Sequence, residues 1–176
     1  GRGRHDRTWM SPLGNLYCSI ILRPNKPAAQ IAQLGFAAAL AAIEAIEPAA
    51  PSTRAMLKWP NDVLMDERKV AGILLEAGDN GAKNDRWLVV GCGINIAHFP
   101  ENVPFPAISI VTATGFQFAV EDVLSGFCGQ FDLWYRHWSA EGFAPLREAW
   151  LERAHPRGTP LNVRLPTATI PGTFED

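Results

Sequence analysis

The stretch KVAGILLE, residues 69–76, decides how the chain folds. It is apolar and β-prone with a polar residue at each end, which predicts a β-strand. Alternation along a strand divides its side chains into two sets on opposite faces: Lys69, Ala71, Ile73 and Leu75 on one, and Val70, Gly72, Leu74 and Glu76 on the other. Gly72 weakens the middle of a strand unless a ligand or another backbone approaches there closely. The stretch therefore predicts a strand that a ligand or another backbone approaches closely at Gly72.

Outward from this strand, the chain mixes further strands with helices. Asp66-Glu67-Arg68 separates it from the apolar residues 63–65, which predicts a β-hairpin. Apolar periodicity predicts helices and strands elsewhere: strands at 17–22 and 87–90, helices at 28–46, 120–138 and 143–154, loops at 1–15, 47–55 and 98–118, and short β pieces at 161–165 and 170–174. Because short turns join several strands, we expect an α+β fold with a mixed, largely antiparallel sheet flanked by helices. The aromatic stripe of the helix at 120–138 is expected to be core.

The composition is that of an ordinary globular protein. The 176 residues are 47% hydrophobic and 19% charged, with a net charge of −2. This balance argues against a general binder of nucleic acid or anionic membranes, which needs a basic surplus. The three cysteines form no CxxC pair and the four histidines show no metal-ligand spacing, so we expect a reducing, cytoplasmic setting. No signal peptide is recognised, and we expect no membrane span, which needs roughly 20 apolar residues.

The first candidate site is GRGR at residues 1–4, followed by Arg7 and Trp9. Glycines let backbone N–H groups approach an anion, and arginine forks clamp carboxylate or phosphate oxygens. An indole nearby can stack on a purine. These are the parts of an adenylate site, although a solvated basic loop has the same composition.

The second candidate site is KWPND at residues 58–62. Pro60 stiffens the turn, so Lys58, Asn61 and Asp62 form a fixed cluster. Lysine can neutralise phosphate, aspartate can hold Mg²⁺, and Lys69 could reach the same anion as Lys58. An Asn-Asp turn closing a hairpin and a solvated hairpin lysine are the alternatives.

The third candidate site is GCGIN at residues 91–95. Its two glycines suit a close approach of a ligand, and Asn95 could contact a base or a ribose. A GxG pattern alone is weak. Cys92 has no assigned base, so a small buried thiol is a better interpretation than a nucleophile.

Together, in this order and spacing, GRGR…R-x-W, KWPND, K-x-A-G-I-L-x-E and G-x-G-I-N resemble the catalytic domain of the biotin–protein ligases. The resemblance implies a class II synthetase-like catalytic domain over residues 1–155, without its N-terminal part, and the truncated start of an SH3-like domain over 156–176. It also implies the activity of that family: biotin and ATP form biotinyl-5′-AMP, and the biotinyl group passes to a lysine of a biotin carboxyl carrier protein or domain. The implied cofactors are ATP, biotin and Mg²⁺. A homodimer is left open, and no nucleic-acid or membrane partner is implied.

The resemblance also implies a role for each motif residue. The catalytic residues would be Arg4, Lys58, Asp62 and Lys69. The biotin-binding residues would be Gly1, Arg2, Gly3, Arg4, Lys69, Gly72, Leu74, Gly91 and Gly93. The ATP and adenylate contacts would be Arg4, Arg7, Trp9, Asn61 and Asn95, with Trp9 stacking on adenine and Asp62 as the metal ligand.

One motif position departs from the family pattern, because Asp6 stands where relatives carry glycine. The extra negative charge beside the arginines keeps a non-catalytic biotin-binding regulatory protein open as an alternative. A lipoate or octanoyl transferase of the related fold is the other alternative. Lys69 would suit its catalytic lysine, whereas KWPND favours the ligase.

Overall fold

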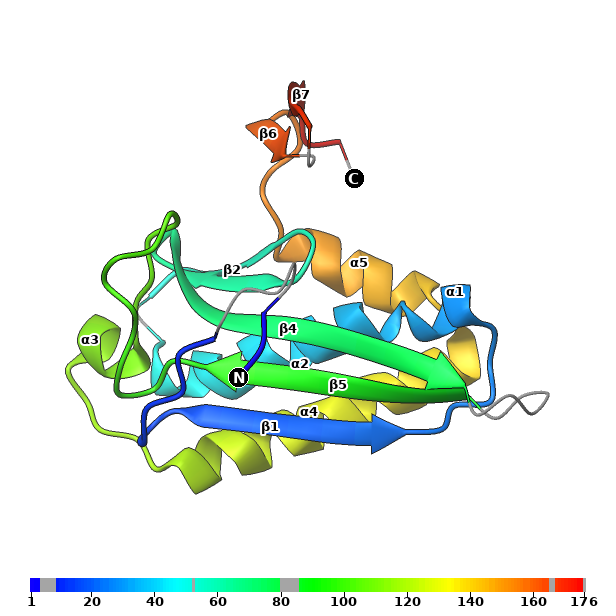
Figure 1. Cartoon of the computed structure of the whole chain (residues 1–176), viewed down its shortest axis with the longest axis horizontal. Coiled ribbons are helices and arrows are strands. Elements are labelled where there is room, and N and C mark those ends of the chain that lie inside the picture. Colours follow the sequence, from blue (N-terminus) through cyan, green and yellow to red (C-terminus); the bar gives the residue numbers. More distant parts are fainter. Residues whose placement is uncertain (4–8, 52, 80–85, 165–166, 176) are drawn as a thin grey trace.

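The computed structural model describes residues 1–3, 9–51, 53–79, 86–164 and 167–175. Five strands form one antiparallel sheet in the order β1-β5-β4-β3-β2. Their bounds are β1 (Leu16–Leu22), β2 (Ala55–Lys58), β3 (Asp62–Met65), β4 (Arg68–Asp79) and β5 (Arg86–Ile94). Helices α2 (Leu34–Ile46) and α4 (Val120–Glu141) lie behind the sheet, and the N-terminal segment crosses its front (Figure 1). The expected α+β fold is confirmed.

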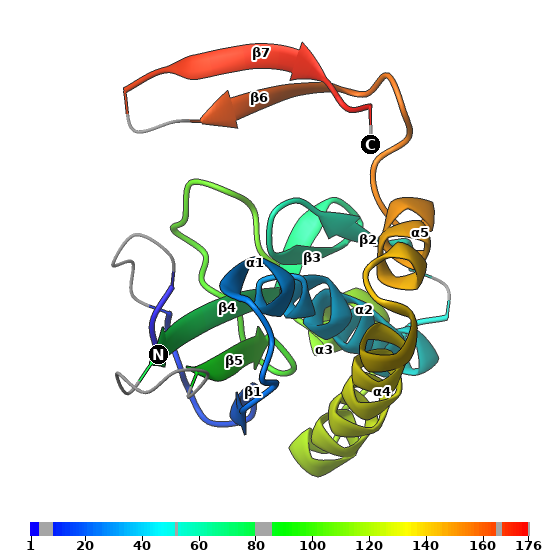
Figure 2. The ribbon, with the colours of Figure 1, turned by 90° about the vertical axis from the view of Figure 1, so that its right-hand side faces the viewer.

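The sheet is one-sided. Along β5 the residues Leu88, Val90, Cys92 and Ile94 are buried against the helices, whereas Gly91 and Gly93 between them are only partly buried. Figure 2 shows α1 (Ala28–Ile31), α2, α4 and α5 (Ala144–Glu152) on one side of the sheet and the N-terminal segment on the other. Antiparallel sheets are commonly covered on one face only, which leaves the other face for a site.

The expected helix at 28–46 is present but broken between α1 and α2. Gln33, Gly35 and Phe36 donate to carbonyls three residues earlier, so the chain tightens locally into a 3₁₀-like turn. A 3₁₀ turn, η2 (Glu47–Ala49), follows α2. The stretch Ala28–Ala49 is, by length and composition alone, apolar enough to cross a membrane, so the expectation that no such stretch exists is wrong. More than half of that stretch is buried inside the fold, as in the core helix of a soluble protein.

A short helix, α3 (Ile110–Thr114), lies inside the segment 98–118 that the sequence predicted to be loop. Ser109 caps its N-terminus by accepting from the Thr112 N–H at 3.2 Å, and Gly115 ends it with a φ of 77°. Five residues are too few to show a helical period, but a serine cap and a terminal glycine are recognisable signals. In α4, by contrast, the aromatic stripe is confirmed as core, since Phe127, Phe131 and Trp138 are buried.

Strands β6 (Pro160–Arg164) and β7 (Thr169–Thr173) pair antiparallel, as expected for the end of the chain. Backbone hydrogen bonds join Gly158 and Thr159 to Phe174, and the Phe174 ring lies 6.4 Å from the ring of Trp150 in α5. That the segment begins an SH3-like domain stays a prediction.

The predicted turn at Asp66-Glu67 joins β3 to β4 through a two-residue loop, since Met65 and Arg68 are partners. Both loop residues have positive φ, 49° for Asp66 and 62° for Glu67. Glycine adopts this conformation without the steric cost that glutamate has. We expect Glu67→Gly to raise the free energy of unfolding by about 1 kcal/mol and the midpoint of thermal unfolding by about 2–4 °C.

The control is the same substitution in a helix. Glu148 is exposed within α5, so Glu148→Gly should lower stability by about 1 kcal/mol. Differential scanning calorimetry measures both variants, and a loss of stability in Glu67→Gly would contradict the assignment of strain to this turn.

Candidate functional site

The predicted glycines gather on the uncovered face of the sheet. Gly72 of β4 is the partner of Gly93 in β5, and Leu74 is the partner of Gly91. A Cβ atom on Gly91 would lie 3.4 Å from the Leu74 carbonyl oxygen. These four residues, which the sequence predicted to line one pocket, are therefore adjacent, and three of them present no side chain to a ligand.

Lys69 reaches this face because β4 contains a β-bulge. Val63 pairs with Ala71, and Leu64 pairs with Lys69, so Val70 is an extra residue without a partner in β3. Strict alternation predicted that Lys69 would lie with Ala71 and opposite Gly72, and that prediction is wrong. The extra residue shifts the alternation of the side chains by one position, so Lys69 lies on the same face as Gly72. Its Nζ atom lies 3.1 Å from where a Cβ on Gly72 would be.

Lys69 forms an ion pair with Asp62 at the centre of the site. The Nζ and Oδ1 atoms are 2.5 Å apart, and the two side chains are only 24% and 21% exposed. Asp62 is the partner of Gly72 across β3 and β4, which brings the carboxylate onto the glycine face. Two predicted catalytic residues from separate motifs thus meet at one point.

Trp9 lies over the two partner glycines. A Cβ on Gly93 would lie 2.8 Å from the indole Cε2 atom, and a Cβ on Gly72 would lie 3.0 Å from Cζ3. The Lys69 Nζ atom lies 5.2 Å from the centre of the ring, within the range of a cation–π contact. The indole Nε1 atom is buried, and no described residue forms a hydrogen bond with it. Trp9 therefore rests on the face predicted to hold biotin, in contact with the lysine predicted to hold its carboxylate.

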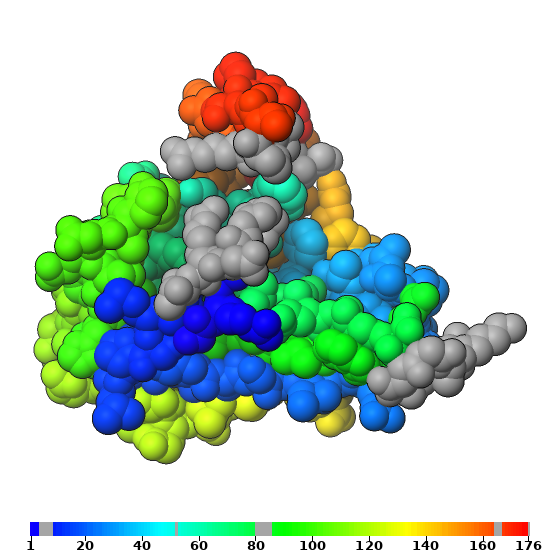
Figure 3. Space-filling view, viewed as in Figure 1, coloured from blue at the N-terminus to red at the C-terminus, as the bar shows by residue number. Residues whose placement is uncertain are grey.

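The N-terminal segment is held across this face, as the blue residues in Figure 3 show. The backbone groups of Gly1 and Trp9 bond in both directions, at 2.9 and 3.0 Å. Arg2 pairs with Glu76 of β4, with its Nη2 atom 2.9 Å from Oε1 and 3.2 Å from Oε2. Arg4 and Arg7, with Asp6, lie outside the described residues, so their predicted roles stay predictions.

The KWPND turn joins β2 to β3. Lys58 and Asp62, the residues at which the turn begins and ends, are partners in the hairpin. The prediction of a turn that closes a hairpin is therefore confirmed, whereas the binding role of Lys58, Asn61 and Asp62 stays a prediction. The Lys58 Nζ atom lies 3.5 Å above the Phe105 ring. Asn61 is tied to β4, since its Nδ2 atom donates to the Ile73 carbonyl at 2.6 Å. Phe105 carried no signal in the sequence, because it lies in a loop without periodicity.

Asn95 and Cys92 of the GCGIN motif are both buried. Asn95 is 3% exposed, and its amide donates to backbone carbonyl oxygens. A direct contact with a nucleotide stays a prediction, and this geometry does not favour it. Cys92 is buried opposite Cys18 on β1, and the hydrogen bond between the thiols and burial raise the pKa of Cys92 well above its usual value. Its interpretation as a buried thiol is therefore favoured over that as a nucleophile.

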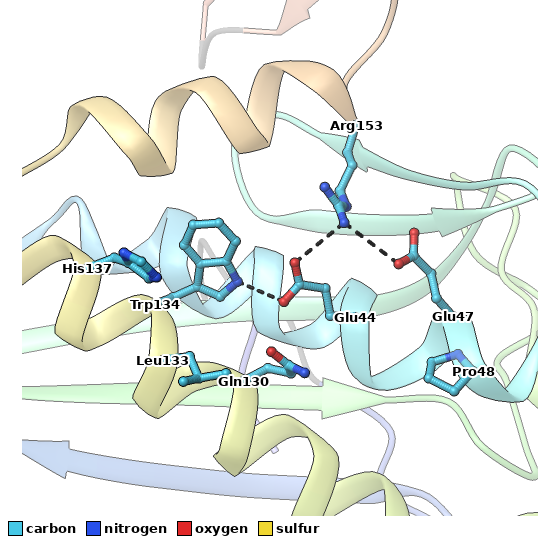
Figure 4. Close-up of a pocket in the computed structure, with 8 residues that line it drawn as sticks. All are labelled: Glu44, Glu47, Pro48, Gln130, Leu133, Trp134, His137 and Arg153. Carbon is cyan, nitrogen blue, oxygen red and sulfur yellow. Dashed lines mark hydrogen bonds and ion pairs between the residues drawn. The ribbon is translucent and has the colours of Figure 1, made fainter.

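A separate hollow of about 470 Å³ lies on the helical side (Figure 4). Glu44 accepts from the Trp134 indole at 2.8 Å and pairs with Arg153 at 3.4 Å, and Glu47 lies 3.8 Å from the same guanidinium. These groups bind one another across α2, α4 and α5. The hollow is on the covered side of the sheet, so it is not part of the predicted site.

Comparisons with known proteins point to one family. The model of the biotin/lipoate A/B protein ligase family matches residues 1–95. Over 181 residues the chain is 41% identical to a protein of Paracoccus denitrificans named biotin–(acetyl-CoA-carboxylase) ligase, which covers 99% of this chain and 75% of the relative. It is 35% identical to the bifunctional ligase/repressor BirA of Bacillus subtilis, and spans only about half of that relative, 53% of its length.

Solved structures agree with the sequence comparison. The biotin protein ligase of Aquifex aeolicus in complex with biotin and ATP matches with a TM-score of 0.82 at 29% identity. The match covers 98% of this chain and 71% of that structure.

The contact between Trp9 and Gly93 gives a test of the site geometry. We expect Gly93→Ala to lower the free energy of unfolding by about 1–3 kcal/mol, because the added methyl group overlaps the indole. In a Trp9→Ala background the same change should cost much less, since the overlapping ring is gone. Urea unfolding of the four proteins measures this coupling.

Gly129→Ala is the matched control. Nothing lies within 4 Å of a Cβ at Gly129, which is an exposed position of α4, so this change should stabilise the helix by up to about 1 kcal/mol. Equal costs of Gly93→Ala with and without Trp9 would show that the indole does not rest on Gly93.

Proposed function

Because the chain belongs to the biotin/lipoate A/B protein ligase family, we propose that it is an ATP-dependent biotin–protein ligase. In the first step a carboxylate oxygen of biotin attacks the α-phosphorus of ATP, which gives biotinyl-5′-AMP and releases pyrophosphate. In the second step the amine of a carrier lysine attacks the acyl carbon, AMP leaves with the bonding electrons, and the amine loses a proton. The observation that carries the proposal is the Lys69–Asp62 ion pair under Trp9, on a sheet face lined by glycines.

The main obstacle to the first step is repulsion between a carboxylate and a triphosphate. A cation fixed between them offsets this repulsion most strongly in a partly dry site, where charges are poorly screened. Lys69 is such a cation, since its side chain is 24% exposed and held by Asp62. Arg4 and Lys58 are proposed to complete the catalytic set with these two residues.

The two substrates are proposed to bind on either side of Lys69. Biotin would lie along the glycine face, where backbone can be approached closely, after the Trp9 indole has moved off Gly72 and Gly93, with these contacts: Gly1, Arg2, Gly3, Arg4, Lys69, Gly72, Leu74, Gly91 and Gly93. The nucleotide would contact Arg4, Arg7, Trp9 and Asn61. The position of Trp9 next to Lys69 supports an indole that meets the nucleotide where the two substrates join.

Mg²⁺ fits this site as a companion of the nucleotide. Among the residues that the structure describes, no three His, Cys, Asp or Glu side chains come together as a metal cage would require. Mg²⁺ usually binds through one or two carboxylates together with substrate phosphates, and Asp62 offers one carboxylate. Bound there, the ion would neutralise phosphate charge.

The proposed acceptor is a lysine of a biotin carboxyl carrier protein or domain, and the proposed setting is the cytoplasm. Residues 1–155 would form the catalytic domain, and residues 156–176 would begin an SH3-like domain. A homodimer stays a prediction from the resemblance. The lipoate transferase and the non-catalytic binding protein are not favoured, because the relatives above are named as biotin ligases at 41% and 35% identity.

The test is a complete reaction with the purified chain, biotin, ATP, MgCl₂ and a carrier domain. We expect pyrophosphate release that depends on biotin, and a carrier whose acceptor lysine carries biotin by mass spectrometry. A carrier with its acceptor lysine changed to arginine is the control. Transfer of octanoate or lipoate in place of biotin would favour the related transferases, and biotin binding without pyrophosphate release would favour a regulatory protein.

Lys69→Ala separates catalysis from stability. Removing a fixed charge from a reaction centre costs about 10²–10³-fold in rate, so we expect adenylate formation to fall by that factor. The ion pair is partly exposed, so stability should fall by only about 1 kcal/mol. Lys26→Ala, an exposed lysine away from the sheet face, is the matched control and should keep both properties. Parallel losses of rate and stability in Lys69→Ala would mean that Lys69 is structural.

A further inference from the structure

Two cysteines that are far apart in the sequence lie directly opposite each other in the sheet. Cys18 of β1 is the partner of Cys92 in β5. Opposite residues of an antiparallel pair have their side chains on the same face, with Cβ atoms roughly 4.5–5.5 Å apart. Here that face is the one covered by the helices, because Cys92 belongs to the buried core and Cys18 packs against that core. The proposed ligase reaction uses neither thiol.

A hydrogen bond between the two thiols makes them chemically different. The Cys92 thiol donates to the Cys18 sulfur, which lowers the pKa of Cys18 and raises the pKa of Cys92 well above its usual value. Burial adds to the rise at Cys92. The thiolate is the nucleophilic form of cysteine, and Cys18 is also the less buried of the two. Cys18 is therefore the thiol that meets an oxidant first.

The pairing of the strands also suits a covalent bond between these sulfurs. A disulfide requires Cα atoms roughly 4.4–6.8 Å apart and Cβ atoms roughly 3.5–4.5 Å apart. Partners in an antiparallel pair have Cα atoms about 4.5 or 5.5 Å apart, so the first requirement is met. The second requires at most a small approach of β1 to β5, and β1 is an edge strand of the described sheet, which eases such a shift.

We propose that Cys18 and Cys92 form a reversible oxidation site, at which hydrogen peroxide converts the two thiols into a cross-strand disulfide. The Cys18 sulfur attacks one oxygen of the peroxide, so the S–O bond forms and the O–O bond breaks. The other oxygen leaves as hydroxide and becomes water with the proton that the Cys18 thiol gave up.

The second step uses Cys92. Its sulfur attacks the sulfur of the Cys18 sulfenic acid, so the S–S bond forms and the S–O bond breaks, and the departing hydroxide becomes water with the Cys92 proton. The two sulfurs together lose two electrons, and these electrons reduce one peroxide to two molecules of water.

The neighbouring thiol decides whether oxidation of Cys18 can be reversed. A sulfenic acid that finds no thiol is oxidised further to a sulfinic acid, which thiol reductants do not restore. A disulfide, by contrast, is returned to two thiols by a thiol reductant, so in a reducing setting the bond is transient. The bridge would lie on the covered face of the sheet, so it would leave the face with Gly91 and Gly93 open.

Cys128 of α4 is a third thiol near the pair. It is exposed, and partial burial together with the charge of Cys18 raises its pKa, which makes it a poorer nucleophile than Cys18. It has no place in the β1–β5 register, so it lacks the alignment that Cys92 has. Within the described residues no three His, Cys, Asp or Glu side chains are arranged to hold a metal ion, so a metal site does not compete with the disulfide.

The first measurement maps the bond in the wild-type chain. The reduced protein, freed of reductant, is treated with hydrogen peroxide, quenched with catalase and alkylated with iodoacetamide. Trypsin and Glu-C protease then digest it without reductant, because cleavage after Glu101 and Glu121 separates Cys92 from Cys128. Mass spectrometry should find a peptide pair linked through Cys18 and Cys92, with Cys128 alkylated, and dithiothreitol should remove the link. A link to Cys128, a link between two chains, or no link would overturn the proposal.

The second measurement removes the second thiol. Cys92→Ser keeps an O–H donor beside Cys18 but cannot form a disulfide. Labelling of the Cys18 sulfenic acid by dimedone should therefore rise about tenfold or more over the wild type, and sulfinic acid that dithiothreitol does not reverse should accumulate. Cys128→Ser is the matched control and should form the disulfide at the wild-type rate. Equal dimedone labelling in Cys92→Ser and the wild type, or loss of the disulfide in Cys128→Ser, would contradict the proposal.

Cys18→Ser gives a further test if Cys92→Ser does not fold by circular dichroism. Without Cys18 the buried Cys92 should stay reduced under the same peroxide treatment, and a disulfide between Cys92 and Cys128 would contradict the proposal. These measurements use neither biotin nor ATP. Failure of the oxidation site and failure of the proposed function are therefore distinguishable.

Discussion

One additional residue in β4 determines on which face of the sheet the Lys69 side chain lies. Without Val70 as a bulge, Lys69 would follow Ala71 and Ile73 into the core, where an unpaired ammonium is expensive to bury. With the bulge, Val70 and Ala71 are both fully buried, and the lysine reaches the side of the sheet without helices. Neighbouring residues of one strand therefore supply apolar side chains to the core and a charged side chain to the open face.

Two glycines of the open face pack against a side chain of this chain. Gly72 and Gly93 leave a flat area between β4 and β5, and the Trp9 indole fills it. Among the described residues the buried indole Nε1 atom has no hydrogen-bond partner, and the ring packs directly on the two glycines. Since Gly1 and Trp9 bond to each other and Arg2 binds Glu76, the glycine-rich segment and the indole are fixed together over the sheet.

Local pattern predicted the strands, the aromatic helix and the β3–β4 turn, because each depends on residues close in sequence. The face of Lys69 could not be predicted in this way, because the bulge is fixed by partners on other strands, Val63 and Asn95 among them. The GCGIN motif predicted Asn95 as a site residue. Its burial depends on the segment 106–110, whose sequence has no hydrophobic periodicity from which its position could be predicted. The motifs thus predicted residues that the fold brings together, Lys69, Asp62 and the glycines of the open face, whereas tertiary contacts decide the face on which Lys69 lies.

Each described cation at the site already has a partner on the same face, and this pairing limits how anions can bind. Lys69 is paired with Asp62, Arg2 with Glu76, and Lys58 lies on Phe105. Paired cations do not repel one another in the free protein, whereas an unpaired cluster would weaken the fold. Under the proposed function, anions that draw Lys69 away leave the Asp62 carboxylate in need of a cation. Mg²⁺ bound with the nucleotide would supply this positive charge in the first step, and in the second step the carboxylate would accept the proton that the carrier amine loses. One carboxylate can therefore serve both halves of the reaction, because the lysine beside it changes partners.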